Sequence, residues 1–273
     1  MIVYLGNKKL NRLYSGDKEV LSPTTVSQTN NILDIEYVVI GGGGYGGAGG
    51  GGGAARFQGT GGAGGGGGLA SGSATLSPGT YPVVAGAAGV SAPLAAINRN
   101  GYSSSFNGLA VAGGGGGGNA GDRDNPNCTN GIGGDGGSGG GNTSWSSLWG
   151  CGNSNGIVGQ GYGGNGTTAA GGAGGAPISS NGGSGSMWLD GVTYSRGGGD
   201  GMTPTNYGDG GIGGNFFPNP SPYISGIAGA VIIRYPGTQV ATGGTIIQTS
   251  GGYTYHTFVS GLFVNPFVIP SKQ

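Results

Sequence analysis

The chain has 273 residues, of which 75 are glycine and only 7% are charged, and its formal net charge is zero. This balance of charge excludes the strongly basic surface typical of nucleic-acid or anionic-membrane binding. No stretch of about 20 apolar residues predicts a transmembrane helix, and two cysteines with one histidine make neither a disulfide framework nor a zinc site. We therefore expect no cofactor, no metal and no membrane insertion.

Residues 1–34 differ in composition from the rest, because six of the twenty charged residues precede residue 20. Two related stretches, YLGNKKL from residue 4 and YSGDKEV from residue 14, each have the pattern of a strand, a tight glycine turn and a strand. We expect a small β module followed by a linker, with attachment to a partner through Tyr4, Leu5, Leu10, Tyr14 and Val20. The start MIVYLGNKKL lacks the apolar core of a signal peptide, so we expect release by lysis.

The second region, residues 35–235, opens with an apolar strand at 35–40, closes with another at 230–235, and is dominated by glycine between them. All-glycine runs occupy 41–44, 49–53, 64–68 and 113–118, and the stretch GIGGDGGSGGG at 131–141 has a non-glycine residue at every third position. The left-handed polyglycine-II helix has three residues per turn and no internal hydrogen bonds, so its backbone must bond to neighbouring helices. We predict such a bundle, with the third residue of each X-G-G unit facing solvent. The alternative is a flexible Gly/Ser coil.

The segment 74–85 predicts a hairpin that turns at Pro78-Gly79. Residues 236–273 predict a C-terminal β meander with strands at 244–249, 253–258 and 261–265. No apolar period of a helix is visible. The predicted fold class is therefore mainly irregular and β, a polyglycine-II bundle flanked by short strands and without α-helix.

Counting antiparallel passes assigns each loop to one end of this bundle. Loops 54–58, 97–107, 142–155, 177–187 and 216–224 are predicted to lie at the distal end, away from strand 35–40, and loops 119–130, 167–170 and 202–207 at the proximal end. Tryptophan, tyrosine and arginine dominate binding hot spots, and the distal set is rich in them. The predicted receptor-binding residues are Arg56, Phe57, Arg99, Tyr102, Phe106, Trp145, Trp149, Trp188, Phe216, Phe217 and Tyr223. The alternative is that these side chains only cap the scaffold.

Catalytic motifs are weak in this sequence. The many GxGxxG matches reflect the glycine content, because no helix or P-loop lysine follows them. His256 has no second histidine or nucleophile beside it in the sequence, and the eight Asp and two Glu show no spacing that singles out a pair. The stretch GDRDNPN lacks the bidentate glutamate of a calcium loop. We do not expect an enzyme.

Five stretches together resemble the glycine-rich domains of bacteriophage tail-fibre proteins: EYVVIGGGGYGGAGGGGG, LSPGTYPVVAGAAG, SSSFNGLAVAGGGGGG, GAVIIRYPGTQVATGGT and SGGYTYHTFVSGLF. The start LGNKKLNRLYSGDKEV is similar to short N-terminal modules of phage tail and fibre proteins. The architecture is similar to the fibre-tip adhesins of T-even-like phages, in which a polyglycine-II sandwich displays receptor-binding loops. The resemblance covers about residues 35–265 and carries over no individual binding residue.

The resemblance implies a virion structural protein, located on the phage tail and extracellular after lysis. It implies a tail-fibre or fibre-tip adhesin that binds a host-surface protein or glycan non-covalently, and that contacts other tail or fibre proteins through its N-terminal module. A homotrimer and a monomer on a trimeric shaft both remain open. The alternatives are a non-recognising virion component, such as a baseplate, head-fibre or decoration protein, and an ice-binding protein.

Overall fold

The fold is taken from a computed structural model of the chain. The residues that it describes are 3–5, 8–15, 18–23, 32–47, 50–51, 58–90, 99–117, 133–142, 154–164, 169–199, 202–213, 224–260 and 266–271, with the backbone alone at 3–23, 50–51 and 58–59. Within these residues the protein is β-strand and irregular chain without any helix longer than a single turn, in agreement with the predicted fold class.

The N-terminal module is a three-stranded antiparallel sheet of β1 (Val3–Leu5), β2 (Lys8–Ser15) and β3 (Lys18–Pro23). Leu5 is paired with Lys8, and Ser15 is paired with Lys18, so two residues separate each pair of strands. A two-residue connection with glycine is the usual loop of a tight hairpin. The predicted strands of this module are therefore confirmed.

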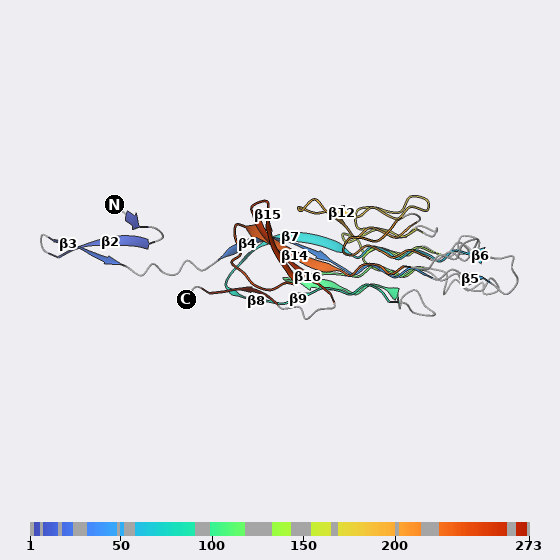
Figure 1. Cartoon of the computed structure of the whole chain (residues 1–273), viewed down its shortest axis with the longest axis horizontal. Helices are drawn as coiled ribbons and strands as arrows, with labels where there is room; N and C mark the ends of the chain where they lie inside the picture. The colour runs from blue at the N-terminus through green and yellow to red at the C-terminus, as the bar shows by residue number, and fades with distance from the viewer. Residues whose placement is uncertain are drawn as a thin grey trace.

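A five-stranded antiparallel sheet forms one end of the glycine-rich region (Figure 1). Its order is β15 (Ile246–Ser250), β16 (Tyr253–Val259), β14 (Ala230–Pro236), β4 (Leu33–Ile40) and β7 (Leu69–Leu76). The first and last predicted strands of the region, β4 and β14, lie side by side, as expected. The hairpin of β15 and β16 is also as predicted, although it continues the sheet of the glycine-rich region and forms no separate unit.

The apolar core lies on one face of this sheet. Alternate residues of β4 and β14 point toward it, as Ile35, Tyr37 and Val39 do, because strand side chains alternate between faces. Short strands cover them: β8 (Gly79–Tyr81), β9 (Val83–Val84), β10 (Ser104–Phe106), β11 (Leu109–Val111) and β17 (Phe267–Ile269). The rings of Tyr37 and Phe106 meet edge to face at 5.1 Å between centroids.

The predicted hairpin at 74–85 is wrong. β7 pairs with β4, and β8 pairs instead with β17, so no ladder joins the two sides of Pro78-Gly79. The apolar side chains of β4 and β17 provide the better partners for these strands. The third predicted meander strand, 261–265, lies outside the described residues.

The glycine runs extend from the sheet as a hydrogen-bonded bundle (Figure 1). We call each extended segment that runs once along the bundle a pass. In residues 41–47, every third N–H group donates to the same neighbouring pass. The bonds to the pass 62–68 are Gly41 to Gly68, Gly44 to Gly65 and Gly47 to Gly62, at 2.8, 2.9 and 2.8 Å. Gly42 and Tyr45 donate to the pass 99–102, and Gly43 and Gly46 donate to the pass 224–227, again three residues apart. Successive N–H groups therefore donate to three neighbouring passes in turn, as expected for the polyglycine-II helix with its three residues per turn.

The same step of three recurs elsewhere in the bundle. Gly64 and Gly67 donate to Gly211 and Gly208, while Gly65 and Gly68 donate to Gly115 and Ala112. Described residues of the bundle therefore lie in a lattice of main-chain bonds rather than in a sheet, and the flexible-coil alternative does not describe them.

The side chains of the X-G-G units follow the prediction only in part. Asp135 and Tyr162 are exposed, as expected. Ser138 and Asp209 are buried, so the third residue of the unit does not always face solvent. The Asp209 carboxylate accepts bonds from the Arg196 side chain and from three backbone N–H groups, which satisfies its charge inside the bundle.

The bundle has two distinct ends. The chain enters through β4 and leaves through β14 at the sheet end. At the opposite end lie the described residues that flank five gaps between passes: 47, 90 and 99, 117 and 133, 142 and 154, and 213 and 224. Short strands β5 (Gly50–Gly51) and β6 (Gln58–Gly59) pair with each other beyond residue 47. We call this the loop end.

The predicted pass count fails at several reversals. A hairpin at Asn107-Gly108 joins β10 to β11 at the sheet end, so the reversal predicted at 97–107 does not lie at the distal end. The next pass, 112–117, consequently runs toward the loop end, and Gly117 and Gly133 flank loop 119–130 there rather than at the proximal end. A further turn at 157–160 returns the chain near the sheet, where Gln160 bonds to Leu69.

Candidate functional site: the loop end and the open sheet face

Seven of the predicted receptor-binding residues lie outside the described residues. They are Arg56, Phe57, Trp145, Trp149, Phe216, Phe217 and Tyr223. The segments that contain them are flanked by described residues of the loop end, which is where the prediction placed them.

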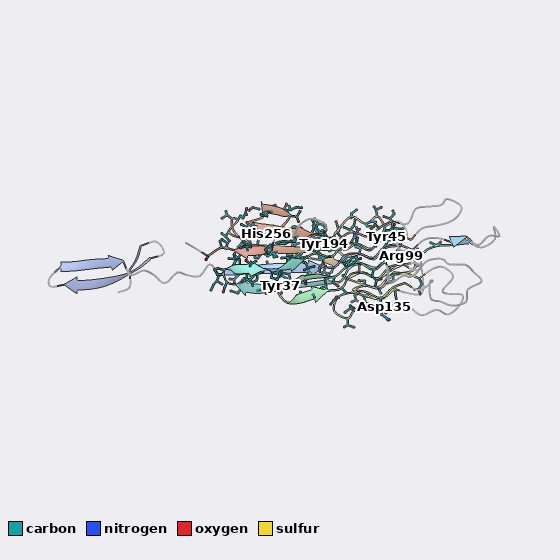
Figure 2. The ribbon with its side chains drawn as sticks, turned by 90° about the horizontal axis from the view of Figure 1, so that it is seen from below. Tyr37, Tyr45, Arg99, Asp135, Tyr194 and His256 are labelled. Carbon is teal, nitrogen blue, oxygen red and sulfur yellow. The ribbon has the colours of Figure 1, made fainter. Side chains whose placement is uncertain are left out.

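Of the four described residues of that set, three are buried. Arg99 is 2% exposed and donates from Nη1 to the Gly117 carbonyl at 2.6 Å, inside the bundle (Figure 2). Phe106 is 1% exposed in the core, and Trp188 is 7% exposed against Val38 and Ile40 on the sheet. The prediction that these three side chains are available to a receptor is wrong. Arg99 lies at the loop end as predicted but is buried, and Phe106 and Trp188 are buried at the sheet.

Tyr102 is 57% exposed, but its carbonyl accepts a bond from Gly42, near the sheet. It therefore lies on the side of the bundle and not at its tip. The predicted attachment residues Tyr4, Leu5, Leu10, Tyr14 and Val20 lie on β1, β2 and β3, and only their backbone is described.

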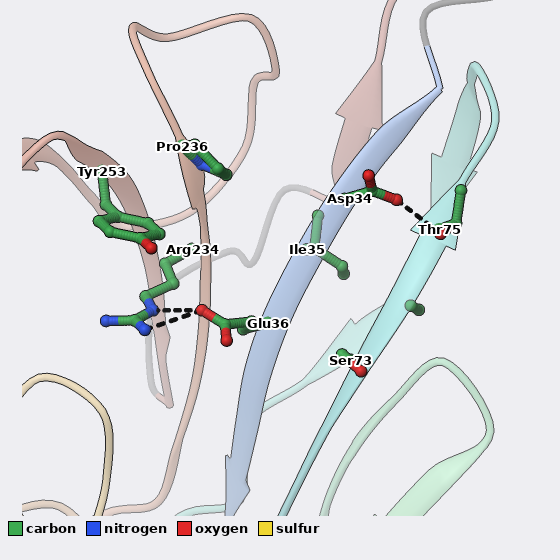
Figure 3. Close-up of a pocket in the computed structure, with 9 residues that line it drawn as sticks. Asp34, Ile35, Glu36, Ser73, Thr75, Arg234, Pro236 and Tyr253 are labelled. Carbon is green, nitrogen blue, oxygen red and sulfur yellow. Dashed lines mark hydrogen bonds and ion pairs between the residues drawn. The ribbon is translucent and has the colours of Figure 1, made fainter.

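The second face of the five-stranded sheet carries a polar and aromatic cluster that the sequence reasoning missed. Arg234 on β14 bonds from Nε to Glu36 Oε2 at 2.8 Å (Figure 3). It also bonds from Nη1 to the Leu189 carbonyl at 3.1 Å. The guanidinium lies 4.4 Å from the Tyr253 ring centroid and 5.6 Å from that of Trp188. Burial alone would lower the pKa of Arg234, but bonds with Tyr255 and Glu36 outweigh it and raise the pKa.

Arg234 cross-links the elements of this face. It joins strand β14 to β4, to β16 and to the hairpin of β12 (Ser186–Met187) and β13 (Thr193–Tyr194). Its donors are largely occupied by protein atoms, so it is poorly placed to bind an anion. The sequence signal was available, since Glu36 and Arg234 both interrupt apolar strands.

A hollow of about 560 Å³ lies beside Arg234 and is lined by Asp34, Glu36, Ser73, Thr75 and Tyr253 among others. Asp34 Oδ1 accepts a bond from the Thr75 hydroxyl at 2.6 Å, and Glu36 Oε2 is engaged by Arg234. The second oxygen of each carboxylate makes no hydrogen bond within the described residues. The hollow can accept hydrogen bonds from hydroxyl or ammonium groups, and it is open and shallow.

A smaller hollow of about 310 Å³ lies on the other side of the β12–β13 hairpin, between Asp190, Tyr207 and Gln248. The Tyr194 hydroxyl donates to Asp190 Oδ2 at 2.6 Å. The Tyr194 ring stacks on the Tyr207 ring, with 6.2 Å between the two ring centroids. Burial, with the neighbouring Asp190, raises the pKa of Tyr194 well above its ordinary value. These contacts hold the β12–β13 hairpin against the sheet.

Within the described part of the chain, no three His, Cys, Asp or Glu side chains gather closely enough to hold a metal ion. No helix there is long and apolar enough to span a membrane.

The fold and its lattice of main-chain bonds are those of a glycine-rich domain. The family of the glycine-rich domain (Gly_rich_2) matches residues 19–236, which is most of the chain, and the chain belongs to this family. Comparison with curated proteins and with solved structures gives no significant match.

Proposed function

We propose that this chain is a structural protein of a bacteriophage virion, a tail-fibre or fibre-tip adhesin. The observation that carries the proposal is that the two ends of the bundle differ. The chain enters and leaves at the sheet end, while the flanks of five gaps between passes lie at the loop end. A binding surface at one end and an attachment at the other is the arrangement that an adhesin needs.

The rigidity of the scaffold supports this function. Each pass bonds to as many as three neighbours, and the close approach of the passes leaves no room for a side chain at glycines such as Gly43 and Gly64. A platform that is ordered before binding loses little conformational entropy when a receptor docks. The motifs that resemble phage tail-fibre domains support the same reading.

In this proposal the receptor-binding surface consists of aromatic and arginine side chains of the loop segments. They are Arg56, Phe57, Trp145, Trp149, Phe216, Phe217 and Tyr223. Such side chains dominate binding hot spots, and aromatic faces suit sugar rings as well as proteins. The β1–β3 module contacts other tail or fibre proteins, and the protein acts on the virion, outside the producing cell after lysis.

The test is a competition for adsorption between purified protein and the phage that encodes it. The wild-type protein is expected to block adsorption to the host, and the double variant Trp145→Ala/Trp149→Ala is expected to lose this block. Val158→Ala is the matched control, because Val158 is 97% exposed in the 157–160 turn near the sheet end. It should block as the wild type does.

The main alternative is a virion component without a recognition role. Failure of the folded wild-type protein to compete at any concentration would contradict the adhesin and favour this alternative. Competition by the wild type and the double variant alike would keep the adhesin but move its binding surface away from the tryptophans.

A further inference from the structure

Both edges of the five-stranded sheet are open. β7 and β15 are the outer strands, each paired on one side only. Within the described residues, Leu69 is the one residue of β7 whose backbone bonds outside the sheet, to the Gln160 carbonyl at 3.1 Å. No backbone group of β15 bonds outside the sheet there. Each edge thus offers unpaired N–H and C=O groups to a further strand.

Neither edge carries the features that proteins use to block such pairing. Natural edge strands are usually protected by charged side chains, by proline or by a bulge. The sequences of β7 and β15, LASGSATL and IIQTS, contain no charge and no proline. Their registers with β4 and β16 run without interruption over all eight and all five residues, so neither strand has a bulge.

The side chains on the two edges are complementary in size. On β15, Ile246 is 47% exposed and Ile247 is 38% exposed, which leaves large branched side chains uncovered. Between Leu69 and Leu76 the residues of β7 are small, with Ala70, Gly72 and Ala74 on the core face and serines and threonine on the other. By register with β16 and β4, Ile247 shares the face of Ala70, Gly72 and Ala74.

We propose that β15 of one copy of this chain pairs with β7 of a second copy, so that the two sheets become continuous. Branched side chains of β15 then pack over the small side chains of β7, and no like charges oppose each other. The partner is a second copy because this one type of contact, repeated from copy to copy, uses both open edges of the sheet. Pairing of β7 with itself would leave the isoleucines of β15 exposed.

This contact is heterologous, since it joins two different surfaces, and repeated pairing gives a ring when the rotation between copies closes. The inference does not depend on the adhesin proposal. Loss of the assembly would leave the adsorption test unchanged in principle, and a non-recognising virion protein would use the same contact.

The first test introduces cysteines at the two edges in a Cys128→Ser/Cys151→Ser background. Ser73→Cys and Gln248→Cys lie on exposed positions of the same sheet face. Four strand spacings, roughly 19 Å, separate β7 from β15 within one sheet, whereas a disulfide needs Cα atoms within about 7 Å. A disulfide must therefore join two copies. Ser71→Cys and Thr75→Cys, each with Gln248→Cys, sample the other registers.

The expected result is a wild-type mass in solution, by light scattering after gel filtration, of two or more times the 26.1 kDa chain. At least one of the three cysteine pairs should form a disulfide-linked oligomer, and the single-cysteine variants should form no ladder beyond a dimer. Ser73→Lys with Ile247→Lys should give a folded monomer, while Val158→Lys, on an exposed turn, should not change the mass. A monomeric wild type at its highest soluble concentration, with no linked oligomer for any pair, would overturn the proposal.

Discussion

A methyl group added at Gly43 would collide with the backbone of a neighbouring pass. Its Cβ would lie far inside the contact distance of the Asp209 carbonyl oxygen, and the Gly43 N–H donates to Ile227 on another pass. No flexible side chain is present to move aside, so the passes themselves would have to separate. Glycine is required here for close approach rather than for a special backbone angle.

Gly43→Ala is therefore expected to lower the free energy of unfolding by about 3 kcal/mol or more, at the upper end for an overpacked site. Gly79→Ala is the matched control. A Cβ at Gly79 meets nothing closer than the Tyr81 ring at 3.7 Å, so the change should be small. Urea denaturation of both variants measures the difference, and equal stability of the two would contradict close packing of the glycine passes.

His256 is a buried residue whose proton positions are fixed by its neighbours. The Tyr235 hydroxyl oxygen accepts bonds from the N–H groups of Val240 and Ala241, both at 3.1 Å. It must therefore donate its own proton to His256 Nε2, at 2.9 Å. His256 Nδ1 then carries the ring proton and donates to the Gly243 carbonyl at 2.7 Å. Protonation of Nε2 would break this network.

Burial lowers the pKa of His256 below its ordinary value of 6.5, although the bond to Gly243 partly opposes the shift. Below about pH 6.5 the unfolded chain binds a proton that the folded chain does not, so the free energy of unfolding should fall as the pH falls. His256 is the sole histidine of the sequence. Denaturation between about pH 7.5 and pH 5 should show this loss in the wild type. The less stable variant His256→Gln should show it much more weakly, and parallel profiles would contradict the assignment.

At the scale of the elements, the β12–β13 hairpin holds the open sheet face through Trp188. The indole packs on Val38 and Ile40 and lies beside the guanidinium of Arg234. Trp188→Ala should destabilise the protein by about 3–5 kcal/mol, as expected for a large buried aromatic side chain. Met187→Ala, which changes a neighbouring side chain that is 70% exposed, should have little effect. Thermal unfolding distinguishes them, and a fully stable Trp188→Ala would return this residue to the candidate binding surface.

Several elements could be predicted from the sequence because their signals are local. The apolar runs of β4 and β14 and the glycine turn between β15 and β16 each specify a strand or hairpin without help from distant residues. The period of three predicted the helix type of the glycine runs. The partner of each strand was harder to predict. β7 and β8 are neighbours in the sequence, but β7 pairs with β4 and β8 pairs with β17, which are distant in the sequence.

Two hairpin signals were present but overlooked. Asn107 and Gly108 have φ of 49° and 79°, as a tight type I′ turn requires, and Asn-Gly is the strongest short hairpin signal. Asp190-Gly191 marks the turn between β12 and β13, with φ of 79° at Gly191. Each reverses the chain next to the sheet, which explains why the pass count placed Phe106 and Trp188 on distal loops.

The burial of Arg99 could not be predicted in this way. Its guanidinium is accommodated by backbone carbonyls of the glycine passes, including that of Gly117. Every residue has a backbone carbonyl group, so no residue type in the sequence indicates which carbonyl will bind Arg99. The same holds for the lattice as a whole, in which most of the stabilising partners are main-chain atoms.

On the scale of the whole molecule, an apolar sheet end anchors the passes and the main-chain lattice holds them together toward the loop end (Figure 2). At the glycine positions of the bundle, stability does not come from side chains, because glycine has none to bury. It comes from hydrogen bonds in three directions, and these bonds must hold together for the loop end to serve as a rigid platform.

Amide hydrogen exchange, followed by NMR, tests this lattice most directly. The N–H groups of Gly42, Gly43 and Gly44 donate to three different passes, at 3.0, 2.8 and 2.9 Å. Their exchange should be slow, with protection close to that of Val38 in the adjoining sheet, and it should be lost together with that sheet in denaturant. Exchange of these glycines at the rate of an unstructured chain, while the sheet stays protected, would contradict the polyglycine-II bundle.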